Sequence, residues 1–301
     1  IFLLMSFHRE YLCQSNLRLI MKVCWWRHRR MKIIFWNIYK KELSSIIADM
    51  IYQYEADIVV LAESENLSSN KLVNQMHSKA QEWNEIVIKA KGNIKVFAKK
   101  QFNILPHKEE KHFSSYKIYI GDKIFLMNTV HFPSAMYSDE VARGHFAERI
   151  SQQFEKIEET IYDKKERSSF VVGDFNLQPY SYGIAGVNAF NATMSMEKAK
   201  TISRKVNGEQ CLFYYNPMWQ LIGKKGNAQG SYYSENDQQS KSMYWYSFDE
   251  VLLRPSLIDR FEWTYFDYIT EINKMSLLIN GKIDKKKYSD HLPLKFEIME
   301  E

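Results

Sequence analysis

Strand-like and helix-like hydrophobic periods alternate along most of the chain, beginning at Met31, and this alternation constrains the fold more than any other feature. A short apolar run predicts a buried strand at 32–36, and a second predicts another at 58–62. Between them, apolar residues recur at helical spacing and predict an amphipathic helix over roughly 42–54. Such alternation is typical of layered α/β folds.

The pattern continues in the rest of the chain. Further strands are expected at 85–90, 94–98, 116–120, 124–130, 169–173 and 294–298, and further helices around 72–76 and over 145–162. Gly121-Asp122 predicts a hairpin turn between two of these strands. Residues 223–242 are rich in Gly, Lys, Ser, Asn and Gln, which predicts a long exposed loop. Because ordered patterns resume after this loop, we expect one domain over 31–301.

Composition supports a folded protein kept in a reducing compartment. Hydrophobic residues make up 45% of the 301 residues, which is enough to bury a core and excludes a disordered chain. The three cysteines are Cys13, Cys24 and Cys211, which are far apart and form no Cys-x-x-Cys pair. This spacing indicates neither a disulfide framework nor a thiolate zinc site, and we expect a cytoplasmic protein. We also expect a monomer.

The positive charge is concentrated in the first thirty residues. The net charge is +5, and residues 31–301 hold equal numbers of basic and acidic side chains. The remainder is therefore neutral overall, which leaves room only for a local basic groove. Residues 1–30 contain no apolar run of signal-peptide or membrane-span quality, so we expect an extension outside the core, neither exported nor embedded in a membrane. The alternative is a basic amphipathic arm that binds a membrane surface or nucleic acid.

Polar residues able to bind metal or transfer protons stand at the ends of the predicted strands. They are Asn37, Glu63, His131, Asp174, Asn176, Asp249, Asp290 and His291. Catalytic side chains are commonly displayed from strand ends in layered α/β folds. Taken singly, each has an ordinary explanation as a cap, a turn residue, a solvated carboxylate or a satisfied histidine. The combination favours a site, because Gly-Asp-Phe-Asn directly follows an apolar strand and Ser-Asp-His-Leu-Pro directly precedes one, so a carboxylate stands beside a second polar group at two separate places.

Six segments containing these residues resemble the endonuclease/exonuclease/phosphatase superfamily, the deoxyribonuclease-I-like metal-dependent phosphoesterases. The segments occur in the family's order, and they are Ile-Ile-Phe-Trp-Asn (33–37), Asp-Ile-Val-Val-Leu-Ala-Glu (57–63), Asn-Thr-Val-His-Phe (128–132), Val-Val-Gly-Asp-Phe-Asn (171–176), Phe-Asp-Glu-Val-Leu-Leu (248–253) and Ser-Asp-His-Leu-Pro (289–293). The resemblance spans nearly all of 31–301. It implies a four-layer α/β sandwich, in which two mixed β-sheets pack face to face with helices outside and the site lies at one end.

The resemblance also implies a role for each residue. Glu63 would bind Mg²⁺ or Mn²⁺, with Asn37 and Asp290 in or near the coordination shell. Asp174 and His291 would position and deprotonate the attacking water, and Asp249 would orient His291. His131 and Asn176 would donate hydrogen bonds to the phosphoryl oxygens.

Three departures from the family pattern bear on these roles. Ala62 precedes Glu63 where the family usually has glutamine, and Glu65 is a rival ligand. Residues 92–97 offer no acidic partner for His131, so we expect Asn93 or the backbone to hold this histidine. A histidine at 131, where abasic-site endonucleases typically have tyrosine, argues against base-excision repair.

The resemblance favours a phosphodiesterase or nuclease acting on nucleic acid or a nucleotide-like substrate. Alternatives are a phosphomonoesterase acting on a small molecule or lipid headgroup, and a non-catalytic binding module. Arginines and tyrosines near the motifs are candidates for substrate contact, namely Arg143, Arg149, Tyr180, Tyr182, Tyr232 and Tyr233. The alternative for the tyrosines is that aromatic loops simply cover the sheet edges.

Overall fold

The structure is a computed structural model that describes residues 30–77, 82–88, 93–134, 139–162, 166–226, 228–235 and 242–300. The expected extension at 1–30 therefore lies outside the described residues, apart from Arg30, which begins the first strand. None of the helices in the described ranges is both long enough and apolar enough to cross a membrane.

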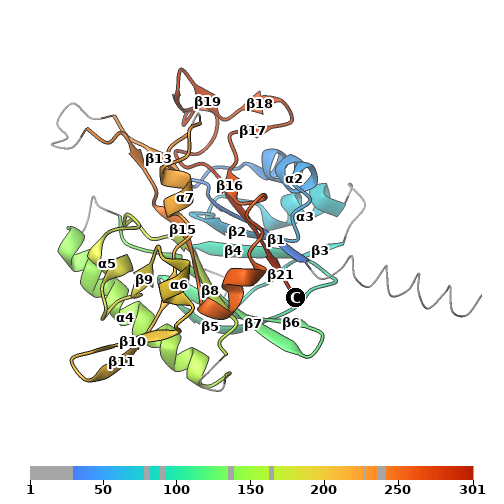
Figure 1. The fold of residues 1–301 in the computed structure, drawn as a ribbon. Helices are drawn as coiled ribbons and strands as arrows, with labels where there is room; N and C mark the ends of the chain where they lie inside the picture. Colours follow the sequence, from blue (N-terminus) through green and yellow to red (C-terminus); the bar gives the residue numbers. More distant parts are fainter. Residues whose placement is uncertain are drawn as a thin grey trace, which may run out of the picture.

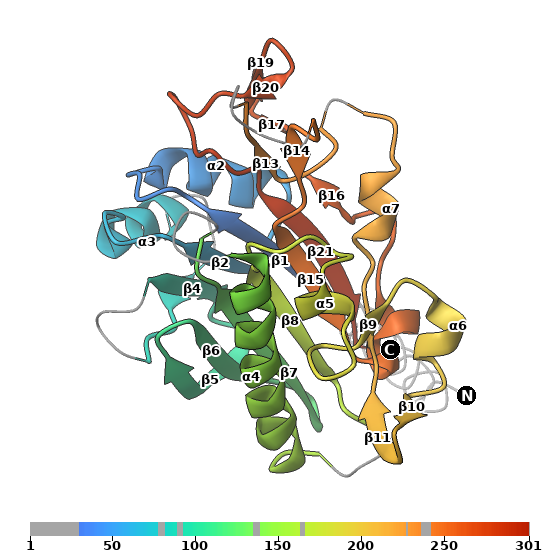
Figure 2. The same ribbon diagram turned by 90° about the vertical axis from the view of Figure 1, so that its left-hand side faces the viewer.

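The first large sheet has, among the described residues, six strands in the order β16-β21-β1-β2-β4-β3. Their bounds are β1 (Arg30–Asn37), β2 (Ile58–Ala62), β3 (Trp83–Glu85), β4 (Ile94–Lys99), β16 (Asp267–Tyr268) and β21 (Leu294–Met299). Strand β1 is parallel to β2 and antiparallel to β21. The parallel pair requires a crossover, which α2 (Ser44–Gln53) supplies. Helix α2 and α3 (Ser69–His77) cover one face of this sheet (Figures 1 and 2).

The second large sheet has seven described strands in the order β5-β6-β7-β8-β15-β12-β9. Their bounds are β5 (Asn103–Glu110), β6 (Phe113–Ile120), β7 (Lys123–His131), β8 (Ser169–Asp174), β9 (Ala192–Thr193), β12 (Tyr214–Tyr215) and β15 (Asp249–Leu253). Strands β7 and β8 are parallel, and α4 (Glu140–Glu159) connects them. Helix α4 runs along the outer face of this sheet (Figure 2).

Short elements fill the connections. They are α5 (Tyr182–Ala185), α6 (Met196–Ala199), β10 (Ser203–Val206), β11 (Glu209–Leu212), α7 (Trp219–Ile222), β13 (Tyr232–Tyr233), β14 (Trp245–Tyr246), η1 (Pro255–Arg260), β17 (Glu271–Ile272), β18 (Met275–Ser276), β19 (Leu278–Ile279) and β20 (Lys282–Ile283).

Two layers of apolar side chains hold the sheets and helices together. One buried cluster joins β1 and β2 to β8 and β15, with Phe35 and Val60 packed in the same core as Val172 and Val251. A second cluster joins α4 to the outer face of β8, through residues such as Phe154. The predicted four-layer α/β sandwich is therefore confirmed.

Most predicted elements are present, and the differences have physical causes. The helix expected over 145–162 begins earlier, at Glu140, because the Asp139 carboxylate caps it by accepting the N–H of Ala142 at 2.7 Å. The strand expected at 85–90 is β3 instead, which ends at Glu85. Strand β5 was not expected, because its sequence is polar and interrupted by a proline, as an exposed edge strand tolerates. The loop expected at 223–242 contains β13, and residues 227 and 236–241 of it lie outside the described residues.

Candidate active site

The strand ends of the two sheets bring the predicted residues together. Strand β15 is antiparallel to β8, so its first residue, Asp249, pairs with the last residue of β8, Asp174. On the other side of β8, His131 pairs with the same aspartate. Three side chains from distant parts of the chain therefore stand in a row at one end of the second sheet.

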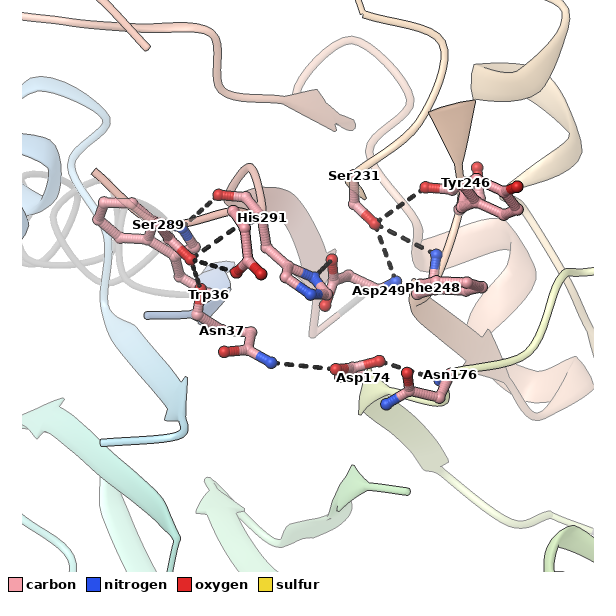
Figure 3. Close-up of polar contacts among 12 residues, drawn as sticks. Trp36, Asn37, Asp174, Asn176, Ser231, Tyr246, Phe248, Asp249, Ser289 and His291 are labelled. Carbon is pink, nitrogen blue, oxygen red and sulfur yellow. Dashed lines mark hydrogen bonds and ion pairs between the residues drawn. The ribbon is translucent and has the colours of Figure 1, made fainter. Parts of the chain in front are cut away.

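Asn37 links the two sheets at this end. Its side-chain nitrogen donates to Glu63 Oε1 at 3.3 Å. The same nitrogen donates to Asp174 Oδ2 at 3.0 Å (Figure 3). Its side-chain oxygen accepts the backbone N–H of Tyr39 at 3.1 Å. Asn37 thus presents its amide nitrogen to the two carboxylates, while its oxygen is engaged by the backbone. Asn37 therefore connects Glu63, at the end of β2, to Asp174, at the end of β8.

His131 lies between the same two carboxylates. Its Nε2 is 3.5 Å from Glu63 Oε1 and 3.9 Å from Asp174 Oδ2. Burial opposes a charge on His131, but the contact with Glu63 and the two negative charges outweigh it and raise the pKa of the imidazole. The hydrogen bond with His131 is the main cause that lowers the pKa of Glu63.

The expected partner of His131 is thus replaced by Glu63 and Asp174. No hydrogen bond joins the Asn93 side chain to His131 within the described residues, and the Asn93 carbonyl instead accepts from Ser64. The backbone of His131 bonds to His112. The rival ligand Glu65 is exposed, whereas Glu63 takes part in these contacts.

Asp174 is buried, and both of its oxygens have partners. Oδ2 accepts from Asn37, and Oδ1 accepts the backbone N–H of Asn176 at 2.9 Å. Burial, together with the nearby charge of Asp249, raises the pKa of Asp174 to about 6. Asn176 stands at a positive φ of 50° and donates its side-chain N–H to the Phe132 carbonyl at 3.1 Å.

Asp249 and His291 form a buried pair with Nδ1 and Oδ2 2.7 Å apart. Burial disfavours the imidazolium, but the charge of Asp249 and its hydrogen bond outweigh this and raise the pKa of His291 to about 10. The pair fixes Nδ1 toward the carboxylate, so Nε2 is the nitrogen left for a ligand.

The segment that carries Asp290 and His291 is attached to β1. The Ser289 hydroxyl donates to the Asn37 carbonyl at 2.5 Å and accepts the N–H of His291 at 3.1 Å. The Trp36 indole donates to the His291 carbonyl at 2.8 Å (Figure 3). The end of β1 therefore sets the position of both residues.

Ser231 is a structural contributor that the sequence interpretation missed. It is fully buried, and its hydroxyl oxygen accepts the backbone N–H groups of Phe248 at 3.2 Å and Asp249 at 3.0 Å (Figure 3). It lies in the segment expected to be an exposed loop, and that part of the prediction is wrong. No signal in the sequence distinguishes this serine from its polar neighbours.

Two groups of side chains fit a divalent cation. The first group is Glu63 and Asp290. Burial and the negative charge of Glu63 both raise the pKa of Asp290. A hard cation between the two carboxylates would relieve their repulsion. In addition, Asp174, Asp249 and His291 offer ligand atoms that lie within 4.8 Å of one another. The oxygen-rich donor set suits Mg²⁺ or Mn²⁺ better than a softer metal.

The candidate substrate-contact residues are spread more widely. Arg143 is buried on α4, and Arg149 lies over the Phe146 ring. Tyr180 and Tyr182 are exposed, the first near Trp219 and the second bonded to Glu148. Only Tyr232, whose ring centroid is 4.9 Å from that of His291, has a ring contact with a predicted site residue among those the structure describes, while Tyr233 packs against Trp245.

Comparisons with known proteins bear on the fold. No family model matches the chain, and no curated protein does. Truncated TDP2 of Caenorhabditis elegans matches with a TM-score of 0.56 at 14% identity, over 90% of this chain and 97% of that one. TDP2 of D. rerio, complexed with single strand DNA product, matches with a TM-score of 0.52 at 14% identity, over 89% of this chain and 98% of that one. Both neighbours belong to the endonuclease/exonuclease/phosphatase superfamily, and the chain has the fold of that superfamily.

Proposed function

We propose that this chain is a divalent-metal-dependent phosphodiesterase that hydrolyses nucleic acid with an activated water molecule. The observation that carries the proposal is the convergence of Glu63 and His131 with Asp174 and the Asp249–His291 pair at one end of the sandwich. These contacts place acidic and basic groups where a phosphate, a cation and a water would have to meet.

In this proposal Glu63 and Asp290 hold Mg²⁺ or Mn²⁺, with Asn37 in or near the coordination shell, and the Asn37 amide nitrogen also bonds to the Glu63 carboxylate. The cation supplies charge stabilisation and substrate orientation. Asp174 accepts the proton of the attacking water, because its carboxylate is held rigidly by Asn37 and by the backbone of Asn176.

His291 donates a hydrogen bond from Nε2 to the phosphoryl group, since Asp249 holds Nδ1 and stabilises the imidazolium. His131 and the remaining N–H of Asn176 donate to the other phosphoryl oxygens. Donors fixed in place before the reaction stabilise developing charge without reorganisation.

Nucleic acid is the substrate class that the comparison supports, because the D. rerio TDP2 structure is described as a complex with single strand DNA product. Phosphomonoesterase activity remains the alternative, and a non-catalytic binding module is disfavoured by the complete set of acidic and basic groups. The free thiol of Cys211 fits the cytoplasmic location that we also propose.

The test is a substrate panel with Mg²⁺, with Mn²⁺ and with EDTA. We expect metal-dependent cleavage of an oligonucleotide, and a loss of about 10² to 10³ in rate for Asp174→Asn. The matched control is Asp122→Asn, since Asp122 is exposed in the turn at the opposite end of β7 from His131. Release of inorganic phosphate from monoesters, without oligonucleotide cleavage, would favour the alternative. The absence of all hydrolysis would contradict the enzyme proposal.

A further inference from the structure

Two segments lie side by side at the edge of the candidate site. Residues 39–41 follow Asn37, and residues 285–288 precede Ser289, whose hydroxyl bonds to the Asn37 carbonyl. The Lys41 ammonium joins the segments by donating to three main-chain carbonyls, those of Lys285, Lys286 and Tyr288. The edge next to Asn37 and Asp290 is therefore built from these two segments.

This edge carries a group of lysines, here called the lysine rim, comprising Lys40, Lys41, Lys285, Lys286 and Lys287. All of them except Lys41 are exposed. Within the described residues, none of the five forms an ion pair, whereas other lysines of the chain do. Of the acids near the rim, Glu42 pairs with Lys71, and Asp284 accepts the Lys287 backbone N–H at 3.2 Å and offsets part of the charge of that lysine. Because residues 31–301 are neutral overall, the rim is a local positive field beside the site.

Tyr39 lies in the chain between Asn37, a site residue, and Lys40, a residue of the lysine rim, and 51% of Tyr39 is exposed. Both Tyr39 and Lys40 adopt left-handed backbone conformations, with φ of 50° and 56°. Such conformations are unfavourable for residues other than glycine and persist where surrounding contacts enforce them. Here the Tyr39 N–H bonds to Asn37 Oδ1 at 3.1 Å, and the Lys40 N–H bonds to the Glu63 carbonyl at 2.8 Å. The site residues themselves thus hold Tyr39 in its exposed position.

We propose that the lysine rim and Tyr39 bind a single-stranded nucleic acid beside the phosphate that is cleaved. The lysines lie against the backbone phosphates, and the Tyr39 ring stacks on an unpaired base. A base inside a duplex has both faces covered by its neighbours, so the ring finds a partner only on a single strand or at a strand end. This inference rests on the proposed function and adds the strand preference and the surface that produces it.

Salt dependence tests the lysine rim. Binding of short fluorescent DNA and RNA single strands is followed by anisotropy in EDTA, so that no cleavage occurs. We expect the Lys285→Ala/Lys286→Ala variant to reduce the slope of log affinity against log salt by about 1.4, since each single-strand phosphate contact contributes about 0.7. The control, Lys156→Ala/Lys205→Ala, removes the same charge from exposed positions on α4 and β10. Equal slopes for the two double variants would overturn the proposal.

Stacking tests Tyr39. We expect Tyr39→Ala to weaken single-strand binding by roughly ten- to a hundred-fold, and Tyr39→Phe to retain binding because it keeps the ring. The wild type should bind a blunt duplex more weakly than the single strand. If Tyr39→Ala weakened binding of the single strand and of the duplex equally, stacking would not be the cause, and this inference would be refuted. Hydrolysis of an aryl phosphodiester by the wild type separates the two proposals. If the wild type hydrolyses the aryl phosphodiester but does not bind the oligonucleotide, only the proposed binding surface is refuted. If it binds the oligonucleotide but hydrolyses neither substrate, the proposed enzymatic activity is refuted.

Discussion

The hydroxyl oxygen of Ser231 accepts the backbone N–H of Asp249 at 3.0 Å, which places this serine directly behind the carboxylate that orients His291. The same oxygen accepts the N–H of Phe248, and the Ser231 carbonyl accepts the N–H of Leu292 at 2.7 Å. One buried residue therefore fixes the chain on both sides of the Asp249–His291 pair.

Replacing Ser231 with alanine should slow catalysis and leave substrate binding nearly unchanged. Two buried N–H groups lose their acceptor, and Asp249 gains freedom to move away from His291. We expect kcat to fall by about ten-fold with little change in KM, as measured by steady-state kinetics. Ser115→Ala is the matched control, because Ser115 is equally buried but bonds to Asn128 on β7. Equal losses in the two variants would indicate a general packing effect.

Asp249→Asn should damage both the chemistry and the charge of His291. The amide keeps the shape of the carboxylate but removes the largest of the negative charges that, with those of Asp174 and Asp290, raise the pKa of His291 to about 10. Burial still disfavours the imidazolium, and less negative charge remains to stabilise it, so the pKa of His291 should fall. NMR titration of the imidazole in metal-free protein measures this shift, and activity should drop by about 10² to 10³. An unchanged pKa would show that Asp249 does not control this histidine.

The sequence predicted the meeting of the site residues better than their individual contacts. The residues at strand ends converge because neighbouring strands in a sheet end together, which the strand pattern already encodes. The partners of His131 were not predictable, since they depend on how the two sheets are placed across the Asn37 bridge. The burial of Ser231 could not be predicted, because a polar, glycine-containing segment has the same sequence pattern whether one of its hydroxyls is solvated or buried.

The buried Glu158 should make the stability of the fold sensitive to acid. Its carboxylate binds Arg254 through several hydrogen bonds, binds Arg167 at 2.9 Å and accepts from the Tyr214 hydroxyl. Burial opposes ionisation, but the charge of Arg254 and these bonds outweigh it and lower the pKa of Glu158 below 4.5. A lowered folded-state pKa stabilises the protein above the unfolded value, and this contribution is lost as the pH falls through the folded-state pKa.

Glu158→Gln should therefore cost about 3 to 5 kcal/mol of unfolding free energy near neutral pH, since it leaves the Arg254 guanidinium buried without a counter-charge. Thermal unfolding at a series of pH values measures the difference between wild type and variant. We expect the difference to shrink in acid. A difference that stays constant below pH 4.5 would argue against ionised Glu158 as its source.

Gly173→Ala should disturb the site through the backbone. A Cβ at Gly173 would lie 2.0 Å from the Val130 carbonyl oxygen, so β7 and β8 would have to separate where they carry His131 and Asp174. We expect a loss of stability of about 1 to 3 kcal/mol, because the inserted methyl overpacks the strand pair. Activity should fall further than this instability explains, since the strand ends that separate are the ones that hold the site. Gly223→Ala is the control, because its added Cβ meets nothing within 4 Å. Chemical denaturation measures the stability of both variants, and oligonucleotide cleavage below the unfolding transition measures their activity. A stable but inactive Gly173→Ala protein would locate the damage at the strand ends.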